Sequence, residues 1–588
     1  MKLYKLSLAL FLGFGAMSMT SCEDKLEVTN PNEQTTGTFG FTSDDLEECV
    51  IAAYHDLRME GSTGRVGYTI DAVRGDEVWN SSQVWYMPFD DMNDPVTDGI
   101  SFWPWREYYY AINVCNFILS RTTGDNAQLS ESMKRIKGQA LFIRGFAYYN
   151  LVGYYKDVPL ITDYSTYSSL DGLYGANNTS DEVLDQAEKD LKEAMELLPN
   201  RQAGGEWAKG RATCGAAAGY YARTLMFRHK YSEALEVLKD IIGGTKYGKY
   251  KLMANYGDNF REGSAYENND ESLFEVQYLD YGTQGVDDEW TPVNVSPNAT
   301  QGHAVESNFA PGDFGGWADL SASPWLYNLF KEERTTAGKL DPRLYWTLGT
   351  YEKEWEGFEN GNVAYTKKIT ATDTLRTNNN YGGIPIAKWT NMRTGLYSSV
   401  ATGLRCGINL RMMRYSDVLL RAAECENEVN GPTEQAIKWI NEVRQRAGLA
   451  DLKLEDFNTK DKLFEQIANV ERPKEFGCEN GRGMDLIRWG FFYDNGRLDQ
   501  LKEHGTFYKS KTIDVKTPVT YAQTKTDPEH VKSSYDTYLP GHEFLPIFQT
   551  LLNNNPNLKG NSANDGIDNS TDFFGRGWTV HPVVDLSK

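Results

Sequence analysis

The chain has 588 residues, a formal net charge of −22 and an aromatic content of 13 %. The excess of carboxylates argues against a nucleic-acid partner, because phosphate backbones are bound by clustered Lys and Arg. An apolar content of 40 % and a charged content of 24 % are ordinary for a globular protein and argue against wholesale disorder. A chain this long can bury its core without so many rings, so we expect some aromatic faces on binding surfaces.

The first 21 residues have the pattern of a lipoprotein signal peptide. Lys2 and Lys5 precede an apolar stretch over 6–17, which is too short for the about 20 residues of a membrane-spanning helix. The small residue before Cys22 resembles a lipobox, whose Cys is lipidated and becomes the mature N-terminus. Met19 stands where a lipobox usually has Leu, and an ordinary signal peptide is the alternative. We expect lipidation at Cys22 and a tether over 22–40.

Helical periodicity occupies two blocks of the chain. The first, about 44–242, contains predicted helices at 44–59, 105–119, 133–155, 179–198, 211–228 and 232–242. Thr179 and Glu182 form a capping-box pattern at the start of one of them. The second block, about 409–490, contains predicted helices at 413–429, 433–447 and 461–470. Periodicity fades between the blocks, so we predict a loop-rich insertion at 243–408 and a loop-rich C-terminal part at 491–588.

Three predicted helices share one spacing of core residues. A small residue comes first and larger ones follow four and seven positions later, as in Ala187–Leu191–Ala194, Ala234–Leu238–Ile241 and Ala436–Ile440–Val443. The small residue lets two helices approach closely, as in tetratricopeptide hairpins, although generic amphipathic helices give similar spacing. We predict an all-α fold over 41–588, a single domain in which a tetratricopeptide-like helix-hairpin scaffold carries the irregular insertion.

Motifs for catalysis and metal binding are lacking. The sequence has no His-Glu-x-x-His helix, no Gly-x-Ser-x-Gly elbow and no phosphate-binding loop. Asp90, Asp91, Asn93 and Asp94 crowd together without the order of a calcium loop, so calcium there is a minor alternative to having no cofactor. The six cysteines after Cys22 form no Cys-x-x-Cys motif, and only Cys406 and Cys425 suggest a disulfide.

The most distinctive segment, 471–489, interleaves acidic and basic residues. Glu471, Glu475 and Glu479 recur at every fourth position, with Arg or Lys between them. Such an array could be a catalytic carboxylate cluster, but we interpret it as an ion-pair network that closes one helix against its neighbours. Arg421 and Glu424 on the preceding predicted helix are the expected partners.

Taken in order, several motifs resemble the SusD/RagB family of surface glycan-binding lipoproteins of Bacteroidetes. They are QALFIRGFAYYNL at 139–151, YYKDVPL at 154–160, NDESLFEVQY at 269–278, LRMMRYSDVLL at 410–420, NEVRQRAG at 441–448, the array at 471–489, LPIFQ at 545–549 and NPNL at 555–558. Members of this family usually end soon after the last motif, whereas this chain continues over 559–588, a segment without an assigned role.

The resemblance implies a helical, outward-facing outer-membrane protein, anchored through Cys22, that binds an oligosaccharide and delivers it to a SusC-type TonB-dependent transporter. It implies no enzyme activity, and the net charge has already argued against a nucleic-acid partner. Two alternatives remain: the same scaffold with a peptide or glycopeptide as cargo, and a surface glycoside hydrolase. The scaffold motifs do not name the sugar, its linkage or its length.

Two loop regions combine aromatic residues, which suit the C–H faces of sugars, with polar residues that suit their hydroxyls. In proteins of this family the site often forms where the loop after the first helix meets the central insertion. We expect Trp79, Trp85 and Trp317 as platforms, with Tyr86 and Trp290 nearby. Asp76, Asn80 and Arg74 are the expected hydrogen-bonding partners. A buried, loop-packing role is the alternative for each Trp.

Overall fold

The computed structural model describes residues 40 and 42–587, with gaps at 81–82, 169–171, 173, 279–301, 353, 355–373, 377–382, 394–405, 509–511 and 515–530. The predicted signal peptide, Cys22 and the tether therefore lie outside the described residues. Among the helices that are described, none is long and apolar enough to cross a bilayer.

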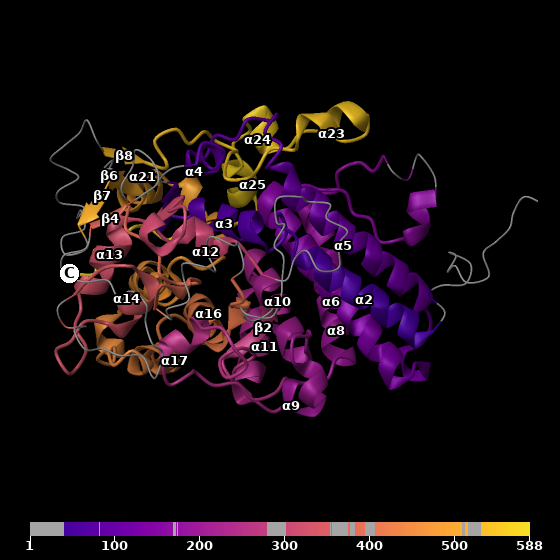
Figure 1. Ribbon diagram of the computed structural model, residues 1–588, viewed down its shortest axis with the longest axis horizontal. Helices are drawn as coiled ribbons and strands as arrows, with labels where there is room; N and C mark the ends of the chain where they lie inside the picture. The colour runs from indigo at the N-terminus through magenta and orange to yellow at the C-terminus, as the bar shows by residue number, and fades with distance from the viewer. Residues whose placement is uncertain are drawn as a thin grey trace, which may run out of the picture.

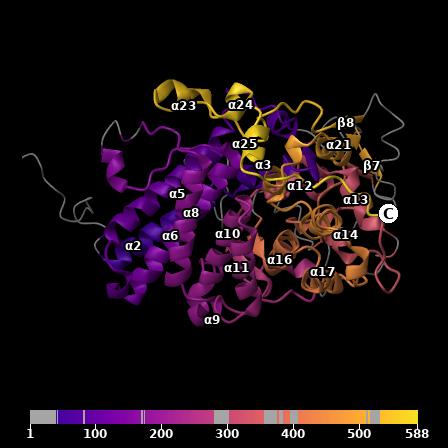
Figure 2. The same ribbon diagram turned by 180° about the vertical axis from the view of Figure 1, so that it is seen from behind.

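Eight long helices form the scaffold, and each packs against the next in chain order. They are α2 (Ser43–Leu57), α5 (Phe102–Arg121), α6 (Glu131–Tyr155), α8 (Ser180–Leu197), α10 (Cys214–Phe227), α11 (Tyr231–Gly243), α16 (Tyr415–Asn430) and α17 (Glu434–Arg446). Figure 1 shows the N-terminal members as an indigo-to-magenta row, and Figure 2 shows the same row from behind. Because α11 packs directly on α16, the row continues across the insertion, and the predicted all-α fold is confirmed.

The local signals read from the sequence are present in these helices. Thr179 Oγ1 accepts a hydrogen bond from the backbone N–H of Glu182 at 3.3 Å, and the Glu182 carboxylate accepts one from the backbone N–H of Thr179 at 2.9 Å. The three repeated triplets are all fully buried between helices. At Gly145 on α6, a Cβ atom would lie 2.8 Å from Leu191 on α8, so glycine is what allows this close approach.

The described parts of the insertion and of the C-terminal region contain short elements. The helices outside the scaffold are α3 (Arg65–Val73), α4 (Met87–Asp90), α9 (Arg201–Gly204), α12 (Val305–Phe309), α13 (Pro324–Lys331), α14 (Pro342–Thr347), α18 (Lys460–Gln466), α19 (Arg472–Phe476), α20 (Arg482–Arg488), α21 (Asn495–His504), α23 (Gln549–Asn554), α24 (Ser562–Asp565) and α25 (Ser570–Gly575). A π-helical turn, Ile467–Glu471, joins α18 to α19.

Within the described residues, four antiparallel strand pairs tie separate segments of the chain together. They join β1 (Val78–Asn80) to β3 (Leu320–Ala322), β2 (Ser272–Val276) to β5 (Leu410–Arg414), β4 (Thr374–Arg376) to β7 (Thr512–Asp514), and β6 (Thr506–Tyr508) to β8 (Val531–Ser533). One large apolar core runs through the scaffold and includes insertion side chains such as Leu326 and Trp389. The six cysteines that the structure describes are buried and unpaired, so Cys406 and Cys425 form no disulfide.

The C-terminal segment returns to the N-terminal half of the molecule. Helices α23 to α25, yellow in Figure 1, lie along the edge formed by α3 and α5 in both views. The backbone N–H of Leu545 donates to the carbonyl oxygen of Tyr154 on α6 at 2.7 Å. Asn561 Nδ2 donates to the carbonyl oxygens of Tyr155 and Leu545, each at 2.8 Å. Residues 559–587 thus have a packing role that the sequence left open.

Candidate functional site

The two aromatic loop regions meet because β1 and β3 pair. Val78 pairs with Ala322, Trp79 with Ser321 and Asn80 with Leu320. This short ladder sets the loop that follows β1, which carries Trp85, beside the turn that precedes β3, which carries Trp317. The family resemblance implied that the first loop meets the insertion. In this structure they meet through a strand pairing between segments about 240 residues apart in the chain.

At this junction Trp85 and Trp317 both contact one arginine. The guanidinium carbon of Arg65 is 5.0 Å from the ring centre of Trp85 and 5.6 Å from that of Trp317. Both tryptophans are partly exposed, whereas Arg65 is only 1 % exposed. Arg65 Nε donates to Glu60 Oε1 at 2.7 Å, which neutralises the buried cation. At two of the three positions expected as platforms, the ring is thus partly exposed, and its role in binding stays a prediction.

Hydrogen-bonded polar side chains support the ring of Trp85. Tyr86 is fully buried and stacks on Trp85 with ring centres 4.0 Å apart. Its hydroxyl is 2.6 Å from Thr69 Oγ1 of α3 and accepts a hydrogen bond from Asn308 Nδ2 of α12 at 2.9 Å. The predicted binding residue Tyr86 is therefore a support under Trp85, and its contacts join α3, α12 and the loop.

The turn before β3 explains why Trp317 follows two glycines. Gly315 has a φ of +81°, which favours glycine, and a Cβ atom at Gly316 would lie 2.0 Å from the carbonyl oxygen of Ala310. The backbone N–H of Trp317 donates to the carbonyl oxygen of Ser307 at 2.7 Å. The backbone of the turn, and hence the start of the Trp317 side chain, is fixed by these contacts.

Trp79 is not a platform in this structure, because its side chain is only 1 % exposed. It stacks on Phe507 of β6 with ring centres 4.0 Å apart and planes within 3° of parallel. The predicted exposed ring at this position is wrong. Trp79 lies in the middle of β1, and its indole fills the space between β1 and the C-terminal strand β6.

The three expected hydrogen-bonding residues are also buried in structural contacts. Asp76 accepts from Arg482 Nε at 2.7 Å and lies 2.8 Å from His504 Nδ1, while Arg74 Nη1 donates to Asp94 at 2.9 Å. The Asn80 side chain bonds the backbone of Gln83 in both directions, at 2.7 and 3.0 Å. None of the three reaches solvent as a sugar ligand would require.

The pKa of Asp76 shows how firmly its contacts hold the charge. Burial alone raises the pKa of this carboxyl, but the charge of Arg482 and the hydrogen bond from His504 lower it overall. Asp76 is therefore an ionised anchor that ties the loop before β1 to α20 and α21. We conclude that it stabilises the fold of the junction.

The acidic cluster considered for calcium is divided among separate partners. Asp94 pairs with Arg74, whereas Asp90 accepts from Ser534 Oγ at 2.6 Å and from the backbone N–H of Asn80 at 3.0 Å. Burial raises the pKa of Asp90 to about 8 and that of Asp94 to about 7. Over the residues that the structure describes, no three His, Cys, Asp or Glu side chains are grouped as a metal site. Calcium binding stays an untested alternative.

Sequence reasoning missed Arg65 and Glu60, and one predicted residue cannot be placed. Trp290 lies in the gap 279–301, outside the described residues. Arg65 begins a short helix that has no distinctive motif, and Glu60 lies in the turn before it. The one signal in the sequence for Arg65 is that it is a basic residue in the first turn of a helix, where the helix dipole favours acidic residues.

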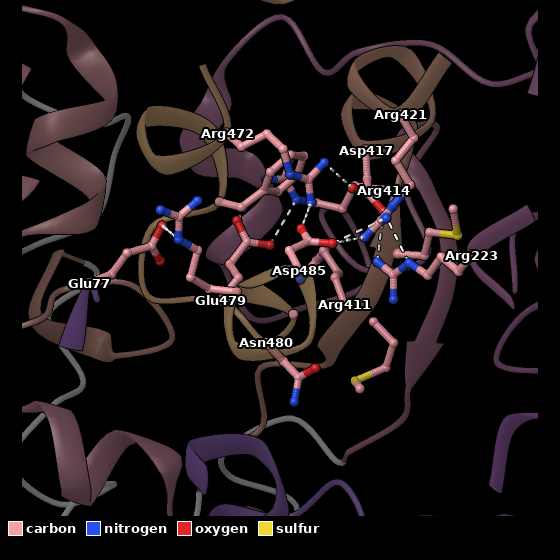
Figure 3. Close-up of a pocket in the computed structure, with 15 residues that line it drawn as sticks. Glu77, Arg223, Arg411, Arg414, Asp417, Arg421, Arg472, Glu479, Asn480 and Asp485 are labelled. Carbon is pink, nitrogen blue, oxygen red and sulfur yellow. Dashed lines mark hydrogen bonds and ion pairs between the residues drawn. The ribbon is translucent and has the colours of Figure 1, made fainter. Parts of the chain in front are cut away.

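The charged array at 471–489 forms the predicted ion-pair network. Figure 3 shows Arg472 between Asp417 and Asp485, and these contacts measure 2.9 and 2.6 Å. Arg488 Nη2 donates to Glu424 at 2.8 Å, and Arg421 pairs with Asp417 at 2.8 Å, so both expected partners take part.

The network encloses a cavity too small for a sugar. Its volume is about 20 Å³, which has room for about one water molecule. Although burial opposes ionisation, arginines lower the pKa of Glu475 and of Asp485, so these carboxylates are held as ions. Neither of these two carboxylates has the raised pKa that a proton donor for glycoside hydrolysis needs. Burial raises the pKa of Glu77, which also lines the cavity, to about 8, but the cavity has no room for a sugar beside it.

Residues 270–565, half of the chain, match the family model described as the SusD family. The chain belongs to the SusD family. Residues 24–226 also match a family described as starch-binding and associating with the outer membrane. The SusD assignment accords with the scaffold described above and confirms the resemblance noted in the sequence.

Curated relatives and solved structures are similar to this chain over most of its length. SusD-like protein P25 of Formosa agariphila is 26 % identical over 530 residues, which cover 84 % of this chain and 91 % of that protein. A SusD superfamily protein from Bacteroides vulgatus has a TM-score of 0.68 at 24 % identity and covers 90 % of this chain and 100 % of its own. Surface glycan-binding protein A from Bacteroides thetaiotaomicron, solved with laminarihexaose, has a TM-score of 0.63 at 20 % identity, covering 88 % and 99 %.

Proposed function

We propose that this SusD-family protein binds a glycan at the cell surface through the junction of Trp85 and Trp317, without cleaving it. The observation that carries the proposal is the pair of partly exposed indoles that β1 and β3 bring together over a buried Arg65. Family membership and the glycan complex of a structural neighbour support the same ligand class.

The chemistry of the junction suits a neutral sugar. Indole edges and faces contact the C–H groups of a sugar ring, and such preformed surfaces need few polar anchors. Since Asp76, Asn80 and Arg74 are engaged in the fold, hydroxyl contacts must come from other groups. The partly exposed Gln83, two residues before Trp85, is the nearest amide in sequence that can donate and accept.

Isothermal titration against laminarihexaose and a panel of other soluble glycans tests the proposal. We expect Trp317→Ala and Trp85→Ala each to weaken binding by roughly 25-fold, the effect of losing about 2 kcal/mol from a central aromatic contact. The matched control is Trp207→Ala, because Trp207 is also partly exposed and also lies under arginine side chains, Arg135 and Arg211. Trp207 adjoins α9, which lies far from α3 and α12 in both Figure 1 and Figure 2.

Three outcomes would overturn the glycan assignment. One is the absence of binding to any glycan of the panel. Another is unchanged affinity in both variants of the junction. The third is the release of reducing ends by the purified protein, which would identify a hydrolase. A peptide that co-purifies with the protein and competes at Trp317 would instead establish the cargo that we considered as an alternative.

We further propose that the protein is anchored to the outer membrane through lipid on Cys22 and passes its ligand to a SusC-type TonB-dependent transporter. The lipobox-like sequence supports the anchor, and the family description supports the membrane. Incorporation of labelled palmitate should be lost in Cys22→Ala. A tagged protein should co-purify with the transporter from detergent-treated outer membranes, and its absence there would contradict the delivery step.

A further inference from the structure

Arg65 occupies a position that ordinary packing does not explain. It is the first residue of α3, where the positive end of the helix dipole disfavours a cation, and no acidic side chain lies in that first turn. It is also 1 % exposed, although Arg is seldom buried without a strong reason. A residue that breaks two local rules at once is expected to serve a function.

The ion pair with Glu60 does not supply that reason. Glu60 lies five residues earlier, and both side chains of the pair are only 1 % exposed. Burying two charges costs about as much as their attraction returns, and apolar residues of similar volume often stabilise a fold equally well. Glu60 therefore holds and neutralises the guanidinium, but stability alone does not require the pair.

What distinguishes Arg65 is its contact with two rings from distant segments. Trp85 follows β1 and Trp317 precedes β3, and the guanidinium lies over both, at 5.0 and 5.6 Å. Cation–π contacts of a buried guanidinium favour particular ring positions, because the charge is attracted to the electron-rich faces. One planar cation thus acts on the orientation of both indoles.

We propose that Arg65, held by Glu60, is a positioning residue that fixes Trp85 and Trp317 relative to each other. This inference rests on the proposed glycan binding of the same two rings. With the rings already set, the ligand does not have to order them, so less affinity is lost on binding. Hydrogen bonds with Thr69 and Asn308 hold the Tyr86 ring on which Trp85 stacks, and Arg65 contacts both indoles.

The first test needs no glycan. In protein labelled with 5-fluorotryptophan, the signals of Trp85 and Trp317 are assigned by Trp85→Phe and Trp317→Phe. We expect Arg65→Met, which keeps the aliphatic stem and removes the charge, to shift or broaden both signals in the fluorine NMR spectrum. The matched control is Arg135→Met on α6, which removes a cation 5.0 Å from Trp207 and should move the Trp207 signal alone.

The second test measures binding to the glycan that the wild type recognises. We expect Arg65→Met to raise Kd about tenfold and Arg65→Lys, which keeps a cation, to raise it less. Glu60→Gln loosens the guanidinium without removing its charge and should shift the same two fluorine signals. This variant keeps the test decisive if Arg65→Met does not fold, since it leaves both the guanidinium and the volume of its partner in place.

The results separate this inference from the proposed function. Unmoved signals of Trp85 and Trp317 in Arg65→Met, or in Glu60→Gln if only that variant folds, overturn the positioning role whatever the protein binds. Moved signals with a Kd within twofold of the wild type overturn its part in recognition. A wild type that binds no glycan overturns the proposed function, while the fluorine spectra still decide whether Arg65 sets the rings.

Discussion

At the residue scale, identical side chains have opposite roles a few positions apart. Trp79 lies within β1 and is covered by Phe507, whereas Trp85 lies in the following loop and keeps part of its surface exposed. Composition and local sequence were alike for both, because each stands among Asn, Gln and aromatic residues. What decides between them is a strand from the C-terminal region, more than 400 residues away in sequence.

The burial of Trp79 gives a prediction about stability. We expect Trp79→Ala to lower the free energy of unfolding by about 3–5 kcal/mol, since a large ring is removed from a filled space. Urea denaturation followed by circular dichroism measures this loss. Trp317→Ala should cost much less, because its ring is already partly in solvent. Equal losses in the two variants would contradict the assignment of Trp79 to the core.

At the element scale, one histidine helps to hold the end of the C-terminal segment against α16 and α18. The family match ends at residue 565, and His581 lies beyond it. Its Nε2 is 2.6 Å from Glu428 of α16, its Nδ1 is 2.6 Å from Asp461 of α18, and its ring stacks on Phe464. A neutral imidazole has one N–H donor, so only the charged ring donates to both carboxylates.

This geometry gives stability a dependence on pH. Burial opposes the charge of His581, but hydrogen bonds and charges from Glu428 and Asp461 raise its pKa above the usual value. A raised pKa means that the stabilisation is complete below the unfolded value of about 6.5 and is lost as pH rises through the folded value. We expect His581→Gln to cost about 1–2 kcal/mol at pH 6, allowing for the exposure of Asp461, and progressively less towards pH 9.

Urea denaturation of both proteins from pH 6 to 9 measures this difference. A cost that does not change across that range would show that His581 contributes through packing on Phe464 rather than through its charge. His55→Gln is a suitable control, since His55 lies on α2, far along the chain from the C-terminal segment.

Long elements were predictable, and the pairings that build the site were not. The predicted helix at 133–155 is α6 (Glu131–Tyr155), and the capping box at Thr179 begins α8 as expected. Long helices can be predicted because their apolar periodicity and their capping residues are local features of the sequence. β1 and β3 have three residues each, too few to show alternation, and their pairing depends on the whole fold. The sequence therefore indicated the right loops but could not tell which of their rings are exposed.

At the scale of the whole molecule, buried ion pairs connect regions of the chain that are not held together by helix packing alone. Arg414 of β5 contacts Glu271, Glu475 and Glu479, at 2.6, 2.9 and 2.7 Å, and so links the insertion to α16 and α19. Arg482 links α20 to Asp76 in the loop before β1. These pairs keep the scaffold, the insertion and the loop before β1 in one arrangement.

The network makes the protein sensitive to acid. Arginines lower the pKa of Asp417, Glu424 and Asp485 despite burial, so their stabilising effect is complete above the unfolded values of about 4 and is lost as pH falls through the lower, folded values. We expect Glu424→Gln, which leaves Arg488 buried without its counter-charge, to cost about 3–5 kcal/mol and to move acid unfolding to higher pH.

Acid unfolding followed by tryptophan fluorescence measures this shift. The control Glu131→Gln breaks an exposed pair with Lys134 and should leave the midpoint unchanged. An unchanged midpoint in Glu424→Gln would contradict a stabilising role for the network.

The return of the C-terminal segment to α6 has a consequence for biogenesis. The sequence of the early helices is synthesised long before Leu545 and Asn561, whose hydrogen bonds complete the end of α6 at Tyr154 and Tyr155. Chains that stop short of these residues leave the end of α6 without these hydrogen bonds, and incompletely packed chains are bound by chaperones and cleaved by proteases. We therefore expect a chain truncated before Leu545 to be degraded by proteases faster than the full-length protein.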